Sequence, residues 1–410
     1  MKVLHVMDHS LPRGDGYSIR AKYLVEAQAR AGDEVVVLTG PAHGPETAPE
    51  IIAGVRYERT WFSSLERAVA RCGGKHLVFQ RALARRMEEI LAVGQFDLIH
   101  GHTPATVARP ALAAARRYGL PFVYEKRNLW EESARVRGRL AGRWPFIAIA
   151  RALDRSVTQQ AGAVCAITRA YADLITRQGV AEDRIVVVGN GVDVDEFRPC
   201  PTDPALRERC LAGGDFVFGF VGSFFSFEGL PFLVSAFAHV ERMHPGARLV
   251  LVGDGESSRE VADLVTQRGL ADKVWLTGRV PHTQVKSFYS AMDVLVYPRH
   301  RSLLTDVVSP LKPLEPMAMA KCVVGSNVGG LRDLIDHGRT GYLFEAESIS
   351  ALADLLSHLA NRRLDADAIG REALAVVTQE RQWKHMAGRY QQAYDVARGH
   401  LLNPVTERAI

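Results

Sequence analysis

The segment SPLKPLEPMAMAKCVVGSNVGG, residues 309–330, decides how the second half of the chain is interpreted. It predicts a helix that begins near Pro313, where a proline is tolerated because the first N–H groups of a helix have no intrahelical partner. Ser309 and the N–H groups at this helix start can bind a diphosphate, and Lys312 can neutralise its charge. Glu315 would face the same pocket and accept two hydrogen bonds from a ribose diol. The segment therefore predicts a nucleotide site.

Short apolar runs alternate with helical patterns on both sides of this segment. The expected strands of the second half are DFVFGFVG, ARLVLVGDG, DKVWLTG, MDVLVYP, KCVVGS and GYLFE. Helical stretches separate most of them, and a strand–helix–strand order predicts a parallel sheet with helices on both faces. Arg299 follows the fourth of these strands, so it is expected to assist Lys312 against phosphate.

The first half of the chain repeats the same pattern. Its expected strands are KVLHVMD, DEVVVLTG, FDLIHGH, PFVYEK and AGAVCAIT. The stretch VVVGNGVDVDEFRPCPTDP, rich in Gly, Pro and Asp, is predicted to be the linker. We therefore expect two facing doubly wound domains, residues 1–195 and 205–378, and a final helical segment, 379–410. Two such sheets create a cleft in which the carboxyl ends of both sets of strands meet one ligand.

Composition indicates a soluble globular protein, since 47% of the residues are apolar and 24% are charged. No apolar run approaches the roughly 18 residues that a membrane span needs, and the N-terminus does not resemble a secretory signal. Five scattered cysteines without metal-binding spacing favour reduced thiols and a cytoplasmic location.

Positive charge is concentrated in one part of the first half. Residues 51–150 hold 17 Lys and Arg against 8 Asp and Glu, a net charge of +9 in a chain whose total is +5. Within this region RVRGRLAGRWPFIAIARAL, residues 135–153, interleaves five arginines with Trp144, Phe146 and isoleucines. This combination suits an anionic membrane surface. A helix with a solvated arginine face is the alternative.

Two loops of the first half are candidates for ligand contact or for ordinary turns. LPRGDGYSIR follows the first strand, and Gly14 and Gly16 would let the backbone approach a ligand. The spacing is not that of a dinucleotide fingerprint. Asp193 and Asp195 in the linker could bind a metal, but a capped turn is the preferred interpretation.

Charged and imidazole side chains follow two other strands. His100 and His102 are expected on the same face of their strand, with His102 closer to the cleft. The group lacks the further ligands that zinc needs. Lys126 and Arg127 follow the next strand, together with Glu131, and indicate either a cleft or a solvated loop.

The motifs together resemble the GT-B glycosyltransferases of the large retaining family 4, over residues 1 to about 400. They are LPRGDGYS, DLIHGHTP, VVVGNGVDVDEFRP, FVGSFFSFEGL, LVLVGDG, LTGRVPH, FYSAMDVLVYP and PLEPMAMAKCVVGSNVGGLRDLI. The phrase SPLKPLE and the loop ending in FEGL are most similar to the branch associated with exosortase and exopolysaccharide genes.

The resemblance implies a nucleotide-sugar donor on the C-terminal domain and an acceptor on the N-terminal one. It also implies retention of configuration, no metal, no cofactor and no nucleic acid. The residues it implicates in donor binding are Gly222, Ser223, Gly253, Arg279, Val280, Ser309, Pro310, Leu311 and Glu315. Those assigned to the acceptor are Gly14, Gly16, Tyr17, Lys126 and Arg127, and those assigned to catalysis are His102, Arg299 and Lys312.

The sequence departs from the family pattern in two ways. Val307 stands where the family has a glutamate that contacts the donor sugar, and Ser223 and Glu228 stand where an arginine and a lysine usually face the diphosphate. Arg299 and Lys312 are expected to replace that cation pair.

The expected activity is therefore hexosyl transfer from a UDP- or GDP-sugar to a glycan or lipid-linked acceptor. It would serve cell-surface or exopolysaccharide synthesis, peripherally at the inner face of the cytoplasmic membrane. The alternatives are a nucleotide-sugar-binding protein without transfer, or a GT-B sugar-nucleotide epimerase or phosphorylase. Hydrolysis of nucleotide-sugars by the purified protein would separate a transferase from a pure binder.

Overall fold

The computed structural model describes residues 1–41, 49–138 and 144–400. The chain divides into two compact units. Unit 1 comprises Met1–Gly189 together with the chain from Trp383 onward, and unit 2 comprises Asn190–Gln382. In the described ranges, no helix is both long enough and apolar enough to cross a membrane.

The described part of unit 1 contains an eight-stranded sheet in the order β3-β4-β2-β1-β5-β6-β7-β8. All neighbouring strands are parallel except β3 and β4. The strands are Lys2–Met7 (β1), Glu34–Thr39 (β2), Glu50–Ile52 (β3), Val55–Arg59 (β4), Leu98–His102 (β5), Phe122–Lys126 (β6), Ala163–Ala166 (β7) and Ile185–Val187 (β8).

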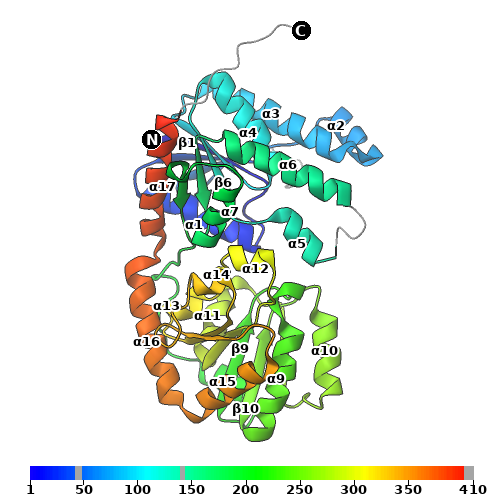
Figure 1. The fold of residues 1–410 in the computed structure, drawn as a ribbon, viewed down its shortest axis with the longest axis vertical. Helices are drawn as coiled ribbons and strands as arrows, with labels where there is room; N and C mark the ends of the chain where they lie inside the picture. The colour runs from blue at the N-terminus through cyan, green and yellow to red at the C-terminus, as the bar shows by residue number, and fades with distance from the viewer. Residues whose placement is uncertain (42–48, 139–143, 401–410) are drawn as a thin grey trace. The chain divides into compact units, whose positions relative to one another are not determined.

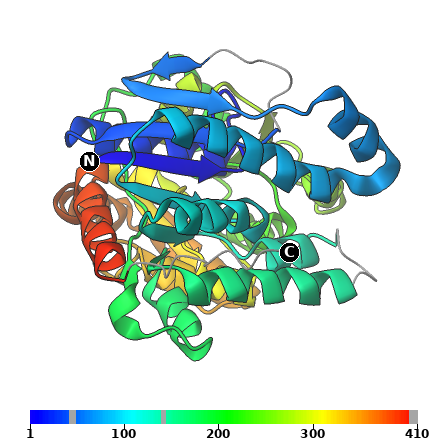
Figure 2. The ribbon, with the colours of Figure 1, turned by 90° about the horizontal axis from the view of Figure 1, so that it is seen from above.

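Helices cover both faces of this sheet (Figures 1 and 2). They are Gly16–Arg30 (α1), Ser64–Val69 (α2), Lys75–Val93 (α3), Ala105–Tyr118 (α4), Trp130–Val136 (α5), Trp144–Gln160 (α6), Arg169–Arg177 (α7) and Trp383–Gly399 (α17), with short turns Ala70–Gly74 (η1) and Glu182–Arg184 (η2). The C-terminal helix α17 packs against α1 and β7. Tyr390 and Tyr394 of α17 are fully buried in unit 1, which explains why the last helix belongs to the first sheet.

Unit 2 has a six-stranded, fully parallel sheet among its described residues, in the order β11-β10-β9-β12-β13-β14. The strands are Phe216–Val221 (β9), Ala247–Val252 (β10), Val274–Gly278 (β11), Val294–Tyr297 (β12), Cys322–Ser326 (β13) and Tyr342–Phe344 (β14). Its centre is apolar on both faces, as a parallel sheet covered by helices requires.

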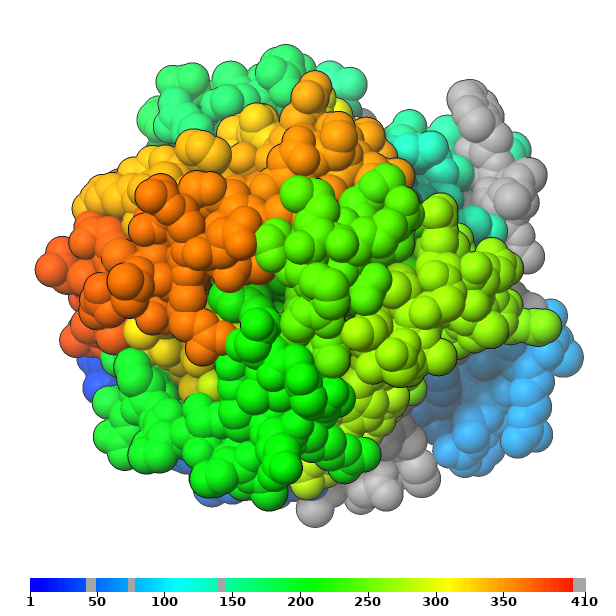
Figure 3. Space-filling view, turned by 90° about the horizontal axis from the view of Figure 1, so that it is seen from below, coloured from blue at the N-terminus to red at the C-terminus, as the bar shows by residue number. Residues whose placement is uncertain are grey.

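The helices of unit 2 are Pro204–Leu211 (α8), Leu230–Met243 (α9), Ser258–Gln267 (α10), His282–Ala291 (α11), Leu303–Val307 (α12), Leu314–Ala318 (α13), Gly329–Arg332 (α14), Ile349–Asn361 (α15) and Arg363–Glu380 (α16), with the turn Ser226–Glu228 (η3). On the surface of unit 2, α15 (orange) lies beside α9 (green) (Figure 3).

Each sheet reverses its strand order at one place. In unit 1 the reversal lies between β1 and β5, and in unit 2 it lies between β9 and β12. Ligands of doubly wound sheets bind outside the carboxyl ends of the strands at such a switch point. The fold therefore predicts that ligands bind near the segments after β1 and β5 in unit 1, and near those after β9 and β12 in unit 2.

The sequence predicted the two doubly wound sheets and a helix in the final segment, which is α17. The linker prediction was wrong at its first residues, because Val186 and Val187 belong to the edge strand β8. The short strands β3 and β4 were missed. The segment 135–153 is not one helix: α5 ends at Val136 and α6 begins at Trp144, while Arg139 and Arg143 lie outside the described residues.

Candidate active site

A buried carboxylate organises the switch point of unit 2. Glu228, only 2% exposed, follows β9, and its Oε1 accepts a hydrogen bond of 2.6 Å from Lys312 Nζ. Arg299, which follows β12, places its Nε 3.8 Å from Glu228 Oε2. Burial would raise the pKa of Glu228, but Lys312 and then Arg299 outweigh this effect and lower it. The cluster contains two cations and one carboxylate, so it keeps one net positive charge.

Gly222 at the end of β9 makes room for the lysine of this cluster. Its φ is +146°, and a Cβ atom there would lie 2.3 Å from Lys312 Cε. Gly253, at the end of β10, is equally restricted, since its Cβ would lie 1.9 Å from the Gly222 carbonyl oxygen. Glycine at position 222 lets the Lys312 side chain cross the end of β9, and glycine at position 253 lets the ends of β9 and β10 approach each other.

The predicted cation pair is therefore present but already partnered. Lys312 keeps part of its side chain exposed, whereas Arg299 is only 4% exposed and also donates to the Val308 carbonyl at 3.0 Å. A direct contact between Arg299 and a diphosphate would require this arginine to leave its buried position. Arg299 is better described as a positioning residue for Glu228, while Lys312 can face a ligand.

Glu315 stands at the start of α13, whose first residue after the cap at Pro313 is Leu314, which confirms the predicted helix start. The Tyr289 hydroxyl donates to Glu315 Oε2 at 2.7 Å. Burial raises the pKa of Glu315 to about 7, although the Tyr289 hydrogen bond and Lys312 oppose this. Since only one carboxylate oxygen is bonded within the described part of the chain, Glu315 can still receive a ligand hydroxyl.

The other predicted donor residues lie along the same edge. Ser309 is buried, and its hydroxyl has no hydrogen-bond partner in the described ranges, while its carbonyl accepts from the Asn190 side chain at 2.8 Å. Pro310, Leu311 and Val280 are half-buried. Ser223 and Arg279 complete the predicted set at the ends of β9 and β11. Helix α13 has only five residues, so its dipole can add little to anion binding.

The switch point of unit 1 is built around a histidine between two carboxylates. His9 Nδ1 lies 2.7 Å from Asp8 Oδ2, and His9 Nε2 lies 2.9 Å from Asp15 Oδ2. Asp15 also caps α1 by accepting from the Ser18 N–H. Burial lowers the pKa of His9, but the hydrogen bonds to Asp15 and Asp8 outweigh this and raise it. His9 in its charged form therefore fastens the loop that carries Gly14.

We expect this histidine to make stability depend on pH. A histidine whose pKa is raised in the folded state stabilises the protein fully at pH values below its unfolded pKa of about 6.5. This stabilisation is lost as the pH rises through the folded-state pKa. His9→Asn should lower the free energy of unfolding at pH 6 by about 1.5–3 kcal/mol, the scale of hydrogen bonds to charged groups. Urea unfolding from pH 6 to pH 9 checks this, because the difference from the wild type should shrink as pH rises. A difference that is the same at every pH would contradict it.

Tyr17 holds the same loop against the sheet. Its hydroxyl donates to the Thr103 carbonyl at 3.0 Å and accepts from the Asp8 N–H at 3.1 Å. The guanidinium of Arg127 lies 3.7 Å from the centre of the Tyr17 ring. Arg127 is only 5% exposed, and none of its nitrogens has a hydrogen-bond partner among the described residues. This arginine remains a candidate for binding an acceptor, whereas Gly14 and Gly16 are exposed at the loop.

Two predicted site residues are buried in the core. His102 has no exposed surface, shares a 3.0 Å hydrogen bond with His5, and stacks on His100 as expected for residues on one face. Burial holds the pKa of His102 well below its usual value. Lys126 is also fully buried, and its amine binds Asp154 and Thr158. Because both side chains are fully buried, neither is accessible to a ligand in this conformation, and both predictions of direct contact are corrected.

The buried histidines have the spacing of metal ligands. His5, His100 and His102 bring their ring nitrogens close together, and His100 lies near Glu125 and Cys165. However, Arg20 forms an ion pair of 2.7 Å with Glu125, and the positive charges of Arg20 and Arg127 lower the pKa of His102, secondary to burial. A metal cation at this buried place would be repelled by the two arginines, with no bulk water to screen the charges. The cluster is therefore better suited to stabilising the sheet. In the linker, Asp193 accepts from the Asp195 and Glu196 N–H groups, as a capped turn predicts.

Two features were missed from the sequence. The pair Asp8-His9 directly after the first strand was a signal for the loop cluster, but its second carboxylate comes from the next turn. Tyr289 lies 26 residues before Glu315, so no local pattern connects the two.

Comparison with known proteins shows the family. Residues 14–196 match the model described as Glycosyltransferase Family 4, and residues 205–375 match Glycosyl transferases group 1. A D-inositol 3-phosphate glycosyltransferase of Frankia alni is 31% identical over 306 residues, covering 68% of this chain and 70% of its own. The chain belongs to the family-4-type GT-B glycosyltransferases.

Other relatives of this glycosyltransferase extend over more of the chain. A GDP-mannose-dependent alpha-mannosyltransferase of Mycolicibacterium smegmatis is 28% identical over 392 residues and covers 92% of this chain and 93% of its own. The structure of sucrose-phosphate synthase from Thermosynechococcus elongatus matches with a TM-score of 0.76 at 20% identity, covering 96% and 98% of the two chains. That likeness confirms the GT-B fold, and the family establishes a hexosyltransferase that uses nucleotide-sugar donors.

Proposed function

We propose that this glycosyltransferase transfers a hexose from a UDP- or GDP-sugar to a hydroxyl of a glycan or lipid-linked acceptor, with retention and without metal or cofactor. Two features of unit 2 support donor binding. Glu315 has one carboxylate oxygen without a hydrogen bond in the described chain, and the Glu228–Lys312–Arg299 cluster has one excess positive charge. A nucleoside diphosphate presents the complementary groups, a ribose diol and a diphosphate.

The transfer reaction needs the protein chiefly to supply positive charge to the leaving diphosphate and to position the two substrates. As the bond from the anomeric carbon to the diphosphate oxygen breaks, negative charge develops on the leaving group, and Lys312 can stabilise it. The acceptor hydroxyl attacks from the same face, and the departing phosphate oxygen takes its proton. Ser309, with an unpartnered buried hydroxyl, is available to donate a hydrogen bond to the donor.

The acceptor would be held by unit 1, through Gly14, Gly16, Tyr17 and Arg127. One relative is named for D-inositol 3-phosphate, so phosphorylated acceptors are among the candidates. The buried Arg127 guanidinium, which has no hydrogen-bond partner in the described chain, is suited to bind a phosphate. Transfer to cell-surface or exopolysaccharide glycans, at the inner face of the cytoplasmic membrane, is the setting that we infer.

A binding protein without transfer is the second candidate. The observation that favours it is Glu228, which compensates half of the positive charge that a diphosphate would meet. An epimerase is less suited, because the buried Val307 replaces one candidate acid/base carboxylate.

A donor screen separates these functions. Purified protein incubated with UDP-, GDP- and ADP-sugars should slowly release the nucleoside diphosphate from one of them, and proton NMR should show retained configuration once an acceptor is added. Release of no nucleotide from any donor, although nucleotides raise the melting temperature, would identify a binder. An inverted product would contradict retention.

We also propose that basic residues of unit 1 attach the protein to anionic membranes. Arg71 and Arg81 are exposed and have no carboxylate partner in the described chain, unlike Arg86, which pairs with Glu58 and Glu89. Reversing both charges, Arg71→Glu with Arg81→Glu, should reduce binding to phosphatidylserine vesicles at least tenfold, at about 1 kcal/mol per basic residue.

Arg268→Glu on the exposed surface of unit 2 is the matched control for this sedimentation assay. Binding should also fall with added salt, because exposed charges are screened within about 10 Å at 0.1 M. Equal and negligible binding to anionic and neutral vesicles would show that the arginines are only a solvated face.

A further inference from the structure

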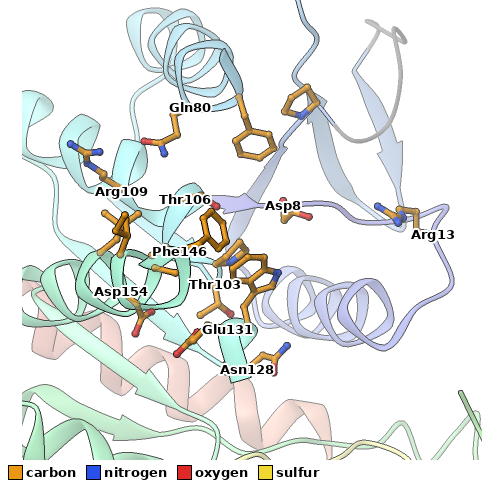
Figure 4. A pocket seen from close by; sticks show the side chains of 18 of the residues that line it. Asp8, Arg13, Gln80, Thr103, Thr106, Arg109, Asn128, Glu131, Phe146 and Asp154 are labelled. Carbon is orange, nitrogen blue, oxygen red and sulfur yellow. The ribbon is translucent and has the colours of Figure 1, made fainter. Parts of the chain in front are cut away.

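Unit 1 contains a cavity of about 570 Å³ that none of the predicted acceptor residues lines. It lies among α3, α4, α5 and α6 and the segment after β1, and its walls are mostly apolar (Figure 4). The apolar wall is formed chiefly by Phe62, Phe79, Trp130, Phe146, Ile149 and Leu153. A volume of this size is typical of sites for small molecules larger than a single sugar ring.

Polar side chains without partners gather on one side of this cavity. Thr103, Asn128 and Glu131 lie together there, whereas Gln80 and Arg109 lie at the far side (Figure 4). Thr103 is 4% exposed, and its hydroxyl has no hydrogen-bond partner among the described residues. Buried polar groups are normally hydrogen-bonded, so this hydroxyl indicates a missing partner.

Glu131 is the second polar group at this side of the cavity, and within the described chain it accepts a hydrogen bond only from its own backbone N–H. It is 8% exposed, and its carboxylate makes neither a hydrogen bond to another residue nor an ion pair within the described ranges. Burial, and to a lesser extent the charge of Asp154, raise the pKa of Glu131. Asp154 is itself satisfied, because it accepts from the Tyr124 hydroxyl at 2.7 Å and binds Lys126. The cavity therefore offers a carboxyl group that is bonded only to its own backbone N–H, beside one hydroxyl without a partner in the described chain.

We propose that this cavity extends the acceptor site named above, because Tyr17 is hydrogen-bonded to Asp8 and Thr103 of its lining. The acceptor is then amphipathic: a hydroxyl-bearing head meets Thr103, Asn128 and Glu131, and an adjoining hydrocarbon group meets the aromatic wall. The proposal rests on the transfer reaction proposed above and specifies its acceptor. Glu131 accepts a hydrogen bond from the head, which orients the hydroxyls of the acceptor.

The apolar lining of the cavity favours an amphipathic ligand over a purely polar one. A free sugar would satisfy the polar side chains but leave most of the apolar wall in contact with water. Phe146 and Ile149 belong to the segment interpreted from sequence as membrane-inserting, yet both line the cavity. Ile149 remains 67% exposed, so it marks an apolar rim from which a hydrocarbon chain can continue outward.

Alkyl glycosides test this directly with the full chain and no nucleotide. Octyl glucoside below its micelle concentration should bind, by isothermal titration calorimetry, at least tenfold more tightly than methyl glucoside or 1-octanol, because only octyl glucoside satisfies both parts of the site. Glu131→Gln and Thr103→Val should each weaken octyl glucoside binding by roughly tenfold, the scale of a lost hydrogen bond to a buried group.

A cavity-filling variant with a matched control distinguishes loss of the binding site from loss of folding. Ala150 lines the cavity, whereas Ala148, on the same helix, is exposed and does not. Ala150→Trp should abolish octyl glucoside binding, and Ala148→Trp should leave it unchanged. Both variants should keep the wild-type thermal shift with UDP or GDP, which reports on unit 2 and shows that the protein is folded.

Each outcome has one meaning. Equal binding of octyl glucoside to the wild type and Ala150→Trp would overturn the proposal, as would equal binding of octyl and methyl glucosides or of 1-octanol. Binding as predicted, with no transfer from any nucleotide-sugar, would leave the cavity assigned and refute the transfer reaction. Transfer to octyl glucoside in solution, compared with transfer to a glucosyl diacylglycerol in phosphatidylcholine vesicles, distinguishes soluble glycosides from lipids as its source.

Discussion

Replacing Glu315 by alanine is expected to weaken binding of the donor nucleotide by about 1.5–3 kcal/mol, the scale of hydrogen bonds to a charged group. The Glu315 carboxylate already accepts one hydrogen bond from Tyr289, which fixes its orientation, and its second oxygen is available for the ribose diol. Calorimetric titration with UDP and GDP measures the loss. Glu345→Ala, which removes an exposed carboxylate of the same unit, should bind as the wild type does.

The pH dependence of the same measurement identifies the ionised form as the one that binds. The pKa of Glu315 is raised to about 7, so the folded protein is partly protonated at neutral pH. Without ligand, this raised pKa makes the protein less stable as pH rises from about 4.5 to 7. A ribose diol that donates to the carboxylate favours ionisation, so nucleotide affinity should fall about tenfold per pH unit below pH 7.

Tyr289→Phe gives a second check on this site. Loss of the Tyr289 hydroxyl removes a hydrogen bond that favours the charged carboxylate, so the pKa of Glu315 should rise and the pH profile of binding should move upward. Unchanged affinity of Glu315→Ala for both nucleotides at every pH would rule out the ribose contact.

The sequence predicted the fold well because its signals are local. The apolar runs of β9, β10 and β12 and the prolines before α13 act within a few residues, and they specify strands and a helix start regardless of the rest of the chain. The exception is local as well: Val186 and Val187 of β8 were taken for linker, since the strand has only three residues and Gly189 follows one residue after its end.

The site was predicted less completely because its geometry depends on distant residues. Lys312 and Arg299 were expected to face a ligand, but burial of Glu228 between them could not be read from a position 71 residues earlier than Arg299. His102 was expected at the cleft, yet His5 from the neighbouring strand β1 binds it inside the core. In both cases a contact with a residue distant in the sequence, rather than the residue type, determined whether the side chain is exposed.

Lys312→Met is expected to slow sugar transfer by roughly 10²–10³-fold, the effect of removing one preorganised group that stabilises developing charge. Binding of the bare nucleoside should change little, because the nucleoside carries no phosphate. Lys384→Met, at an exposed position of α17, is the control for loss of one positive charge. Arg299→Met should also slow transfer, since Arg299 positions Glu228 and so Lys312. Wild-type rates in both Lys312→Met and Arg299→Met would refute the role of this cluster.

Glu228→Gln tests the same cluster in the opposite direction. Loss of the carboxylate leaves Lys312 and the buried Arg299 without their counter-charge, so the ligand-free protein should be less stable than the wild type. A diphosphate would then replace the missing negative charge. UDP or GDP should therefore raise the melting temperature of Glu228→Gln more than that of the wild type, while uridine or guanosine should shift both proteins equally. Equal shifts with the diphosphates would mean that Lys312 does not face the phosphates, and that Glu228 serves only to stabilise the end of β9.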